Sequence, residues 1–258
     1  MFPHSNFLPG IPIRIFETHS RIPFHSALDS LQKSTIIQEH FAQLRLFGGF
    51  PLFLILLLEL IGTVAFAISG AIIGIRKNMD MLGVCIMGLT TACGGGIFRD
   101  LLLGQIPPSM FTSPIYPLTA LITSIITFIP AVRHSHFLQV HHLETTVFLA
   151  DAVGLGVFTS VGVNAVQAAG YGSNVFFALT LGVITGVFGG VVRDVLAGDR
   201  PYIFIKHIYA CASLAGAVVY YLSSYVFPVF PSMLLGAFVT LIIRVLAAHF
   251  HWSLPKAR

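Results

Sequence analysis

Apolar residues fill seven long stretches of the chain, and charged residues lie almost wholly between them. A helix needs roughly 20 mostly apolar residues to cross the hydrocarbon core of a bilayer. The pattern therefore predicts seven transmembrane helices, over residues 51–75, 81–98, 110–132, 145–169, 172–192, 207–225 and 226–250.

The composition agrees with a membrane environment. Hydrophobic residues make up 55% of the 258 positions and charged residues 9%, whereas soluble domains carry roughly 25% charged residues. The net charge is only +4 and the basic residues form no clusters, so a nucleic-acid partner is not expected. No nucleophile–base motif, phosphate-binding loop or metal-ligand spacing occurs, so we predict no enzyme, cofactor or metal site. Cys85, Cys93 and Cys211 fall in apolar stretches and are expected to be small buried packing residues.

Lysine and arginine in short loops decide how a membrane protein is oriented. They follow the first, third, fifth and seventh stretches, as Arg76, Lys77, Arg133, Arg200, Lys206, Arg244, Lys256 and Arg258. The connections after the second, fourth and sixth helices contain neither residue, with Arg99 counted in the end of the second helix. This asymmetry predicts that the odd-numbered loops are cytoplasmic, so that the membrane domain begins outside and ends inside.

Residues 1–50 form a separate extension. They lack the apolar core and small-residue cleavage site of a signal peptide. Leu31, Ile37, Phe41 and Leu44 recur at roughly helical spacing, which allows an amphipathic surface helix. The interpretation that we favour is an extension that is poorly ordered or absent from the mature protein.

One motif occurs twice. Gly-Gly-x-x-Arg-Asp ends at Asp100 and again, 94 positions later, at Asp194, and upstream Glu59 aligns with Asp151. The chain thus divides into a first repeat (51–133), a second repeat (145–225) and a seventh helix with its tail (226–258). Because three helices per repeat is an odd number, the second repeat enters the membrane from the opposite side. Inverted repeats of this kind are typical of transporters, with the pathway where the repeats meet.

The repeated motif resembles a known family. Gly-Gly-Gly-x-x-Arg-Asp, followed by Leu-Leu-Leu-Gly and a proline, is similar to bacterial proteins of the trimeric intracellular cation channel superfamily. The second copy and Ile208-Tyr209-Ala210 are similar to it too, and bacterial members are also described as glycine transporter domain proteins. The resemblance covers residues 52–255 and implies a homotrimer with a conducting pathway inside each subunit. The chain departs from the pattern at Phe188, which stands where the first copy has Gly94.

The glycines of the motif are the first candidates for a pathway. Glycine in a helix interior costs about 1 kcal/mol relative to alanine, so Gly94, Gly95 and Gly96 need a reason, as do Gly189 and Gly190. One hypothesis is close helix packing. The hypothesis that we favour is a broken helix, in which these residues offer backbone carbonyls to a cation from both sides of the membrane.

The charged residues of the motif are the second candidates. Arg99 and Asp100 should lie near the outer face, and Arg193 and Asp194 near the inner face. Since consecutive residues point about 100° apart around a helix, arginine and aspartate of one copy are not expected to pair with each other. We predict that each bonds a neighbouring helix, in a structural and gating network rather than in direct ion contact.

Two single acids lie well inside predicted helices, and intramembrane acids usually face a partner or a cavity. Glu59 and Asp151 could form salt bridges to Arg99 or Arg193, or line the pathway and attract cations. Lys206 opens the sixth helix near the inner interface, where it is expected to anchor at the lipid headgroups. The histidines between 134 and 142 are expected in a solvated loop rather than in a metal site.

Three classes of function remain. The superfamily resemblance favours a homotrimeric channel for monovalent cations, potassium or sodium, in the bacterial plasma (inner) membrane. A secondary transporter of glycine or another small amino acid is the alternative, because arginine and aspartate in each repeat could bind both charges of a zwitterion. A purely structural membrane protein ranks third, because it does not explain duplicated polar groups in lipid.

The topology is directly testable. A reporter fused after Arg258 should be cytoplasmic, and one inserted at Gly172 should be external, because basic residues follow only the odd-numbered helices. Paired phosphatase and fluorescent-protein fusions measure both positions. Finding both reporters on the same side of the membrane would contradict the inverted arrangement of the repeats.

Overall fold

The computed structural model describes residues 50–129, 143–205 and 208–252. The predictions for residues 1–49, for the histidines between 134 and 142, and for Lys206 lie outside these ranges. Within them every regular element is helical and no strand occurs. The helices are α3 (Phe50–Arg76), α4 (Met81–Leu102), α5 (Ser109–Thr112), α6 (Ile115–Phe128), α8 (Leu143–Val166), the π-helical turn η2 (Gln167–Tyr171), α9 (Val175–Leu196), α10 (Tyr202–Ile205), α11 (Tyr209–Ser223) and α12 (Val229–His249).

Five of these helices are long and apolar enough to cross a membrane: α3, α4, α8 with its π-helical turn, α9 and α12. Their ends lie within a few residues of the predicted ones. α6 and α11 are apolar but have only 14 and 15 residues, fewer than the ~20 of a complete span. The prediction of one helix over residues 110–132 is wrong. The chain instead forms α5 and α6, and Pro114, which has no N–H to donate, stands directly before α6.

Large apolar side chains cover the outside of the helices. Leu82 on α4 is 68% exposed, Phe176 on α9 is 81% exposed and Phe238 on α12 is 58% exposed. In water such a surface would be a strong aggregation hazard, whereas lipid chains cover it without cost. Cys85 and Cys93 are buried as predicted, but Cys211 is exposed, so the prediction of three buried cysteines is wrong for this one.

The two copies of the motif are built alike. α4 begins at Asp80, whose carboxylate accepts the Gly83 N–H at 2.7 Å, and α9 begins at Asn174, whose amide oxygen accepts the Phe177 N–H at 3.0 Å. Both helices end in the same way. In each helix, the backbone N–H of the fifth residue after the motif's aspartate donates to the backbone carbonyl of that aspartate, at 2.8 Å for Asp100 and 2.9 Å for Asp194. Local capping thus repeats along with the sequence.

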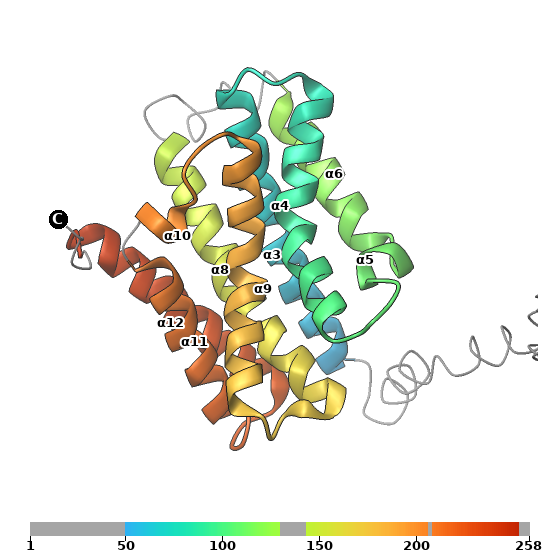
Figure 1. Cartoon of the computed structure of the whole chain (residues 1–258), viewed down its shortest axis with the longest axis vertical. Helices are drawn as coiled ribbons and strands as arrows, with labels where there is room; N and C mark the ends of the chain where they lie inside the picture. The colour runs from blue at the N-terminus through green and yellow to red at the C-terminus, as the bar shows by residue number, and fades with distance from the viewer. Residues whose placement is uncertain (1–49, 130–142, 206–207, 253–258) are drawn as a thin grey trace, which may run out of the picture. The chain divides into compact units, whose positions relative to one another are not determined.

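α4 and α9 lie side by side in close contact (Figure 1). A Cβ atom added at Gly95 would lie 2.1 Å from the Thr185 carbonyl oxygen, and one added at Gly189 would lie 2.2 Å from the Thr91 carbonyl oxygen. Moving forward along α4 from Thr91 to Gly95 thus means moving back along α9 from Gly189 to Thr185. The two helices are therefore antiparallel. The reciprocal pairing means that the backbones touch where the two motifs meet.

Both helices continue without interruption through their glycines. The prediction that Gly94, Gly95 and Gly96 break the first helix is therefore wrong, and so is the matching prediction for Gly189 and Gly190. Regular hydrogen bonding occupies the carbonyls that a broken helix would have released. Gly95 and Gly189 instead allow two backbones to approach, which is the packing hypothesis for these two positions.

The remaining helices pack against this pair and against one another. α3 packs on α4 and α8, and it contacts α8 through Phe66 and Phe158, whose stacked rings are 5.3 Å apart. α6 packs on α3 and α4, while α11 packs on α9 and α8, and α12 packs on α8 and α11 (Figure 1). α12 thus packs next to helices that lie beside the second copy of the motif.

Two ion pairs bring together loops that are predicted to be cytoplasmic. Lys77 after α3 lies 2.6 Å from Asp199 after α9, and Arg76 lies 3.6 Å from Glu144 at the start of α8. The connections after the first and fifth predicted spans and the start of the fourth therefore lie at one end of the helices. This common end is what the lysine and arginine distribution requires.

The glycine contacts generate a matched pair of variants. Gly95→Ala should destabilise the protein by about 1–3 kcal/mol, because its methyl group would overpack the backbone of α9. Gly94→Ala is the control, since its added Cβ has no neighbour nearer than 3.8 Å and alanine favours helix by about 1 kcal/mol. Thermal unfolding in mild detergent measures both variants. Equal stability of the two variants would contradict the packing role of Gly95.

Candidate functional site

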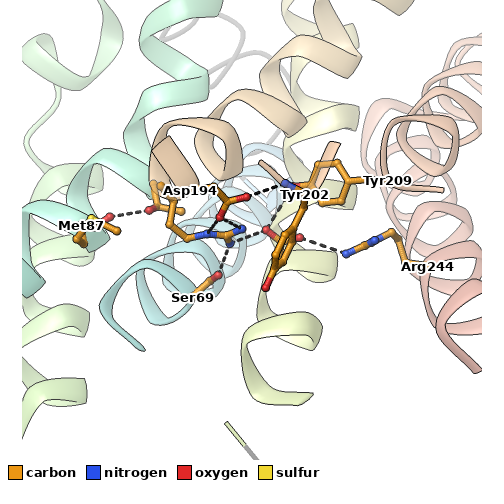
Figure 2. Close-up of polar contacts among 9 residues, drawn as sticks. Ser69, Met87, Asp194, Tyr202, Tyr209 and Arg244 are labelled. Carbon is orange, nitrogen blue, oxygen red and sulfur yellow. Dashed lines mark hydrogen bonds and ion pairs between the residues drawn. The ribbon is translucent and has the colours of Figure 1, made fainter. Parts of the chain in front are cut away.

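A cluster of charged and hydroxyl side chains lies inside the protein where six helices meet (Figure 2). Arg193 and Asp194 come from the last turn of α9 and Asp151 from α8. Ser69 of α3, Tyr202 of α10, Tyr209 of α11 and Arg244 of α12 complete this group, which we call the second-repeat site.

Arg193 is the centre of the second-repeat site and is fully buried. Its Nη1 donates to Asp151 Oδ1 at 2.7 Å and to Ser69 Oγ at 2.5 Å. Its Nε donates to Asp194 Oδ1 at 2.8 Å, and its guanidinium also lies 5.0 Å from the ring centre of Tyr202. Two carboxylates and one hydroxyl thus compensate the cost of burying this cation.

The prediction that arginine and aspartate of one motif do not pair is wrong. Consecutive Cα–Cβ bonds do diverge around the helix, but the arginine side chain is long enough to fold back over its neighbour. Arg193 and Asp194 pair through Nε and Nη2, both 2.8 Å from Oδ1. The other oxygen of Asp194 accepts the Tyr202 N–H at 2.8 Å, so the aspartate also holds the start of α10.

The prediction that each arginine bonds a neighbouring helix is confirmed for Arg193. Its bonds reach Asp151 in α8 and Ser69 in α3, and Ser69 belongs to the other repeat. Asp151 therefore forms the salt bridge that was one of its two predicted roles.

The first repeat carries a similar arrangement, which we call the first-repeat site. Arg99 Nε donates to Asp100 Oδ1 at 2.8 Å, and Asp100 Oδ2 accepts from the Ser109 N–H at 2.8 Å and from its hydroxyl at 2.6 Å. The Tyr116 hydroxyl donates to Glu59. In the second-repeat site the Tyr209 hydroxyl likewise donates to Asp151, at 3.3 Å. Three features are therefore repeated: the arginine–aspartate pair, the backbone N–H that bonds the aspartate, and the tyrosine hydroxyl that bonds the aligned acid.

The two sites differ in burial. The Arg99 side chain is 13% exposed, whereas those of Arg193 and Asp151 are 0% exposed. Glu59 and Tyr116 are also only partly buried. The first-repeat site is the one that solvent or ions reach more easily in this structure.

The two sites also differ in charge. Among the described residues, the first-repeat site holds the carboxylates Glu59 and Asp100 with one guanidinium, that of Arg99, which leaves one negative charge. The second-repeat site holds two carboxylates and two guanidiniums, because Arg244 adds to Arg193. Among these described residues, the first-repeat site thus holds one carboxylate more than guanidiniums, and the second-repeat site holds equal numbers of both.

The glycines contribute unequally to the sites. A Cβ at Gly190 would lie 2.7 Å from the Tyr209 hydroxyl and 3.3 Å from Asp151 Oδ1, so this glycine lets both groups reach α9. Its counterpart Gly96 has space, with Arg99 Nη2 the nearest atom at 3.9 Å. Gly190 thus belongs to the second-repeat site, whereas Gly96 borders a looser first-repeat site.

Several residues of the sites were not found by sequence reasoning. Arg244 was counted with the cytoplasmic end of the seventh helix, but it is 4% exposed and contacts Asp151. An arginine inside an apolar stretch was the signal that could have found it. Tyr116 and Tyr209 each follow an isoleucine at the start of a helix, and that repeated pair was the second signal.

No group of three metal-ligating side chains occurs among the described residues. The sites hold arginines, carboxylates and hydroxyls, and these suit charge recognition. The fold and the sites define a helical membrane protein of a transport type, built around a duplicated arginine–carboxylate motif.

The chain belongs to the family described as "Glycine transporter", whose model matches residues 56–131 and 148–225. It is 39% identical over 200 residues to the UPF0126 inner membrane protein YadS of Escherichia coli, covering 77% of this chain and 93% of that protein. It is 36% identical to a UPF0126 membrane protein of Deinococcus radiodurans, covering 78% and 91%.

Solved structures resemble the chain over nearly their whole length. A TRIC cation channel is 39% identical, with a TM-score of 0.68 and coverage of 78% of this chain and 96% of that one. The orthologue of the TRIC trimeric intracellular cation channel from Rhodobacter sphaeroides is 30% identical, with a TM-score of 0.69 and coverage of 77% and 98%. The resemblance to the trimeric intracellular cation channel superfamily is thereby confirmed.

Burial makes the two motif arginines unequal. Arg193→Met should destabilise the protein by about 3–5 kcal/mol, because it leaves buried carboxylates without their cation. Arg99→Met should cost clearly less, because the Arg99 side chain is 13% exposed and Asp100 keeps the N–H and the hydroxyl of Ser109 as donors. Thermal unfolding of the two purified variants in one detergent makes the comparison. A loss as large for Arg99→Met would contradict the difference between the sites.

Proposed function

We propose that this protein is a cation channel, a multi-pass protein of the bacterial inner membrane that conducts monovalent cations, potassium or sodium. The observation that carries the proposal is the 39% identity with a TRIC cation channel over 96% of that chain. The inner membrane location is supported by the relative from Escherichia coli, an inner membrane protein by name.

The proposed architecture is a homotrimer of seven-helix subunits. Residues 51–133 and 145–225 would form two inverted repeats, and 226–258 a seventh helix with a cytoplasmic end. The reciprocal contacts of Gly95 and Gly189 support the inverted repeats. The trimer rests on the relative from Rhodobacter sphaeroides, which is called trimeric.

The proposed pathway runs within each subunit along the crossing of α4 and α9. Glu59 supplies negative charge to it, Asp151 supplies a carboxylate that Arg193 and Arg244 neutralise in this structure, and the glycines at 94–96 and 189–190 form its small-residue wall. Arg99 with Asp100, and Arg193 with Asp194, form the charge network that holds the ends of α4 and α9. The net negative charge of the first-repeat site supports cation rather than anion entry.

The second candidate is a transporter of glycine or a similar amino acid. The description of the family favours it, and so does the pairing of arginine with carboxylate in each site, since a zwitterion needs both charges. Against it stands the second-repeat site, where internal partners satisfy both charges in this structure. We therefore rank it below the channel.

Flux in liposomes separates the two functions. Purified protein should pass potassium down a gradient without accumulating radiolabelled glycine, and Glu59→Gln should lower the potassium flux because it removes the net negative charge. Protein-free liposomes are the control, and native mass spectrometry of the same preparation measures the trimer. Glycine uptake without potassium flux would reverse the ranking of the two functions.

A further inference from the structure

Arg244 has no counterpart in the first-repeat site among the described residues. It comes from α12, the helix that lies outside the repeats, and it brings a second guanidinium to Asp151. The aligned acid Glu59 receives the Tyr116 hydroxyl instead. The seventh helix therefore alters one site and leaves the other unchanged.

Arg244 is held far more loosely than Arg193. Its Nη2 lies 3.4 Å from Asp151 Oδ2, at the outer limit of a hydrogen bond. Its Nε is buried and has no hydrogen-bond partner among the described residues; the same holds for Arg193 Nη2, but that atom lies 2.8 Å from Asp194 Oδ1 in an ion pair. Arg193, by contrast, makes bonds of 2.5–2.8 Å to Ser69, Asp151 and Asp194. The Arg244 contact with Asp151 is thus the weakest polar bond of a guanidinium in this site.

Aromatic rings supply the rest of the support for Arg244. Its guanidinium carbon lies 4.6 Å from the ring centre of Tyr209 and 4.9 Å from that of Phe148. The electron-rich faces of such rings attract cations in general. They would attract an alkali cation in the same place, so this part of the site does not depend on a guanidinium.

The two oxygens of Asp151 have different partners. Oδ1 accepts from Arg193 at 2.7 Å and from the Tyr209 hydroxyl at 3.3 Å. Oδ2 meets only Arg244 among the described residues, at 3.4 Å. If Arg244 withdraws, Asp151 keeps Arg193 as its partner, and Oδ2 faces the space beside the Tyr209 and Phe148 rings that the Arg244 guanidinium now fills.

We propose that Arg244 is a tethered cation that occupies the position at Asp151 Oδ2 where a permeating monovalent cation binds, and so closes the second-repeat end of the pathway. The inference rests on the proposed function and extends it with a gating residue. Withdrawal of α12 removes the tethered charge, and the entering cation takes its place. The exchange conserves charge, so the buried carboxylate is never left without a partner.

The flux test uses two substitutions of Arg244 in the full chain. Arg244→Gln removes the charge and should raise potassium flux in liposomes by roughly tenfold, equivalent to ~1.4 kcal/mol. Arg244→Lys keeps a tethered cation and should stay near the wild-type flux. Val245→Ala is the control, because that neighbouring side chain is exposed on the outside of α12 and should change nothing. Unchanged flux in Arg244→Gln, with a conducting wild type, would overturn the inference.

A binding test uses no flux. Arg244→Gln should gain thermal stability when potassium replaces choline at constant ionic strength, because only the folded protein binds the ion. The double variant Asp151→Asn/Arg244→Gln should lose that gain. A melting temperature of Arg244→Gln that falls in choline and does not recover in potassium would assign Arg244 a structural role and overturn the inference.

The two tests separate this inference from the proposed function. Potassium-dependent stabilisation of Arg244→Gln in a protein whose wild type and variants all fail to pass potassium would support the cation site and reject the channel. Flux through the wild type without stabilisation of the variant would retain the channel and reject the site.

Discussion

The buried guanidinium of Arg193 constrains more of this protein than any other single group. It is fully buried and bonded to side chains from α3 and α8 and to its own neighbour in α9. Taking a cation out of water costs several kcal/mol unless charged partners are placed around it with good geometry. The helices α3, α8 and α9 therefore have to pack with one axial shift and one rotation about their axes, because any other arrangement leaves the charge of Arg193 uncompensated. Asp194 extends the same constraint to α10 through the Tyr202 N–H.

The close approach of α4 and α9 makes that geometry possible. Gly95 and Gly189 allow the two backbones to touch, and the ends of these helices then carry the two arginine sites. The pairing is not fully symmetric. Phe188 stacks on Phe98 with ring centres 4.4 Å apart. At the aligned position on the other side, Gly94 faces Val192 without a ring. The departure at Phe188 thus fills one side of the crossing and leaves the other less filled.

Hydropathy was enough to predict the long helices, because lipid requires continuous apolar stretches with every backbone group bonded internally. It was not enough for residues 110–132, where a proline divides the helix. The internal repeat was enough to predict that Glu59 corresponds to Asp151 and that one motif corresponds to the other. Residues that align in the two copies of the sequence occupy equivalent positions in the structure.

The sequence could not decide which of two structural roles a given residue plays. Three glycines suit a broken helix or a close crossing equally well, and only the 2.1 Å approach of a Gly95 Cβ to the Thr185 carbonyl oxygen decides between them. The prediction that arginine and aspartate of one motif do not pair was wrong because it considered only the angle between their Cα–Cβ bonds. A long arginine side chain can fold back across that angle. Arg244 was misplaced for a related reason. Its position near the end of an apolar stretch fits an interface, and only the packing of α12 on α8 turns it inward.

α12 gives the molecule a direction that the two copies of the motif lack. Two identical inverted repeats would present equivalent sites at both ends, and any difference in charge between the ends has to come from outside the repeats or from substitutions within them. α12 supplies such a difference by placing Arg244 against Asp151, whereas the described residues of the first-repeat site include two carboxylates and one guanidinium. In a carrier of inverted repeats, the repeats rock around one fixed site near the membrane midplane, whereas the two sites here lie at opposite ends of the antiparallel pair α4 and α9. The unequal burial of Arg99 and Arg193 and the one-sided position of α12 therefore favour conduction over exchange.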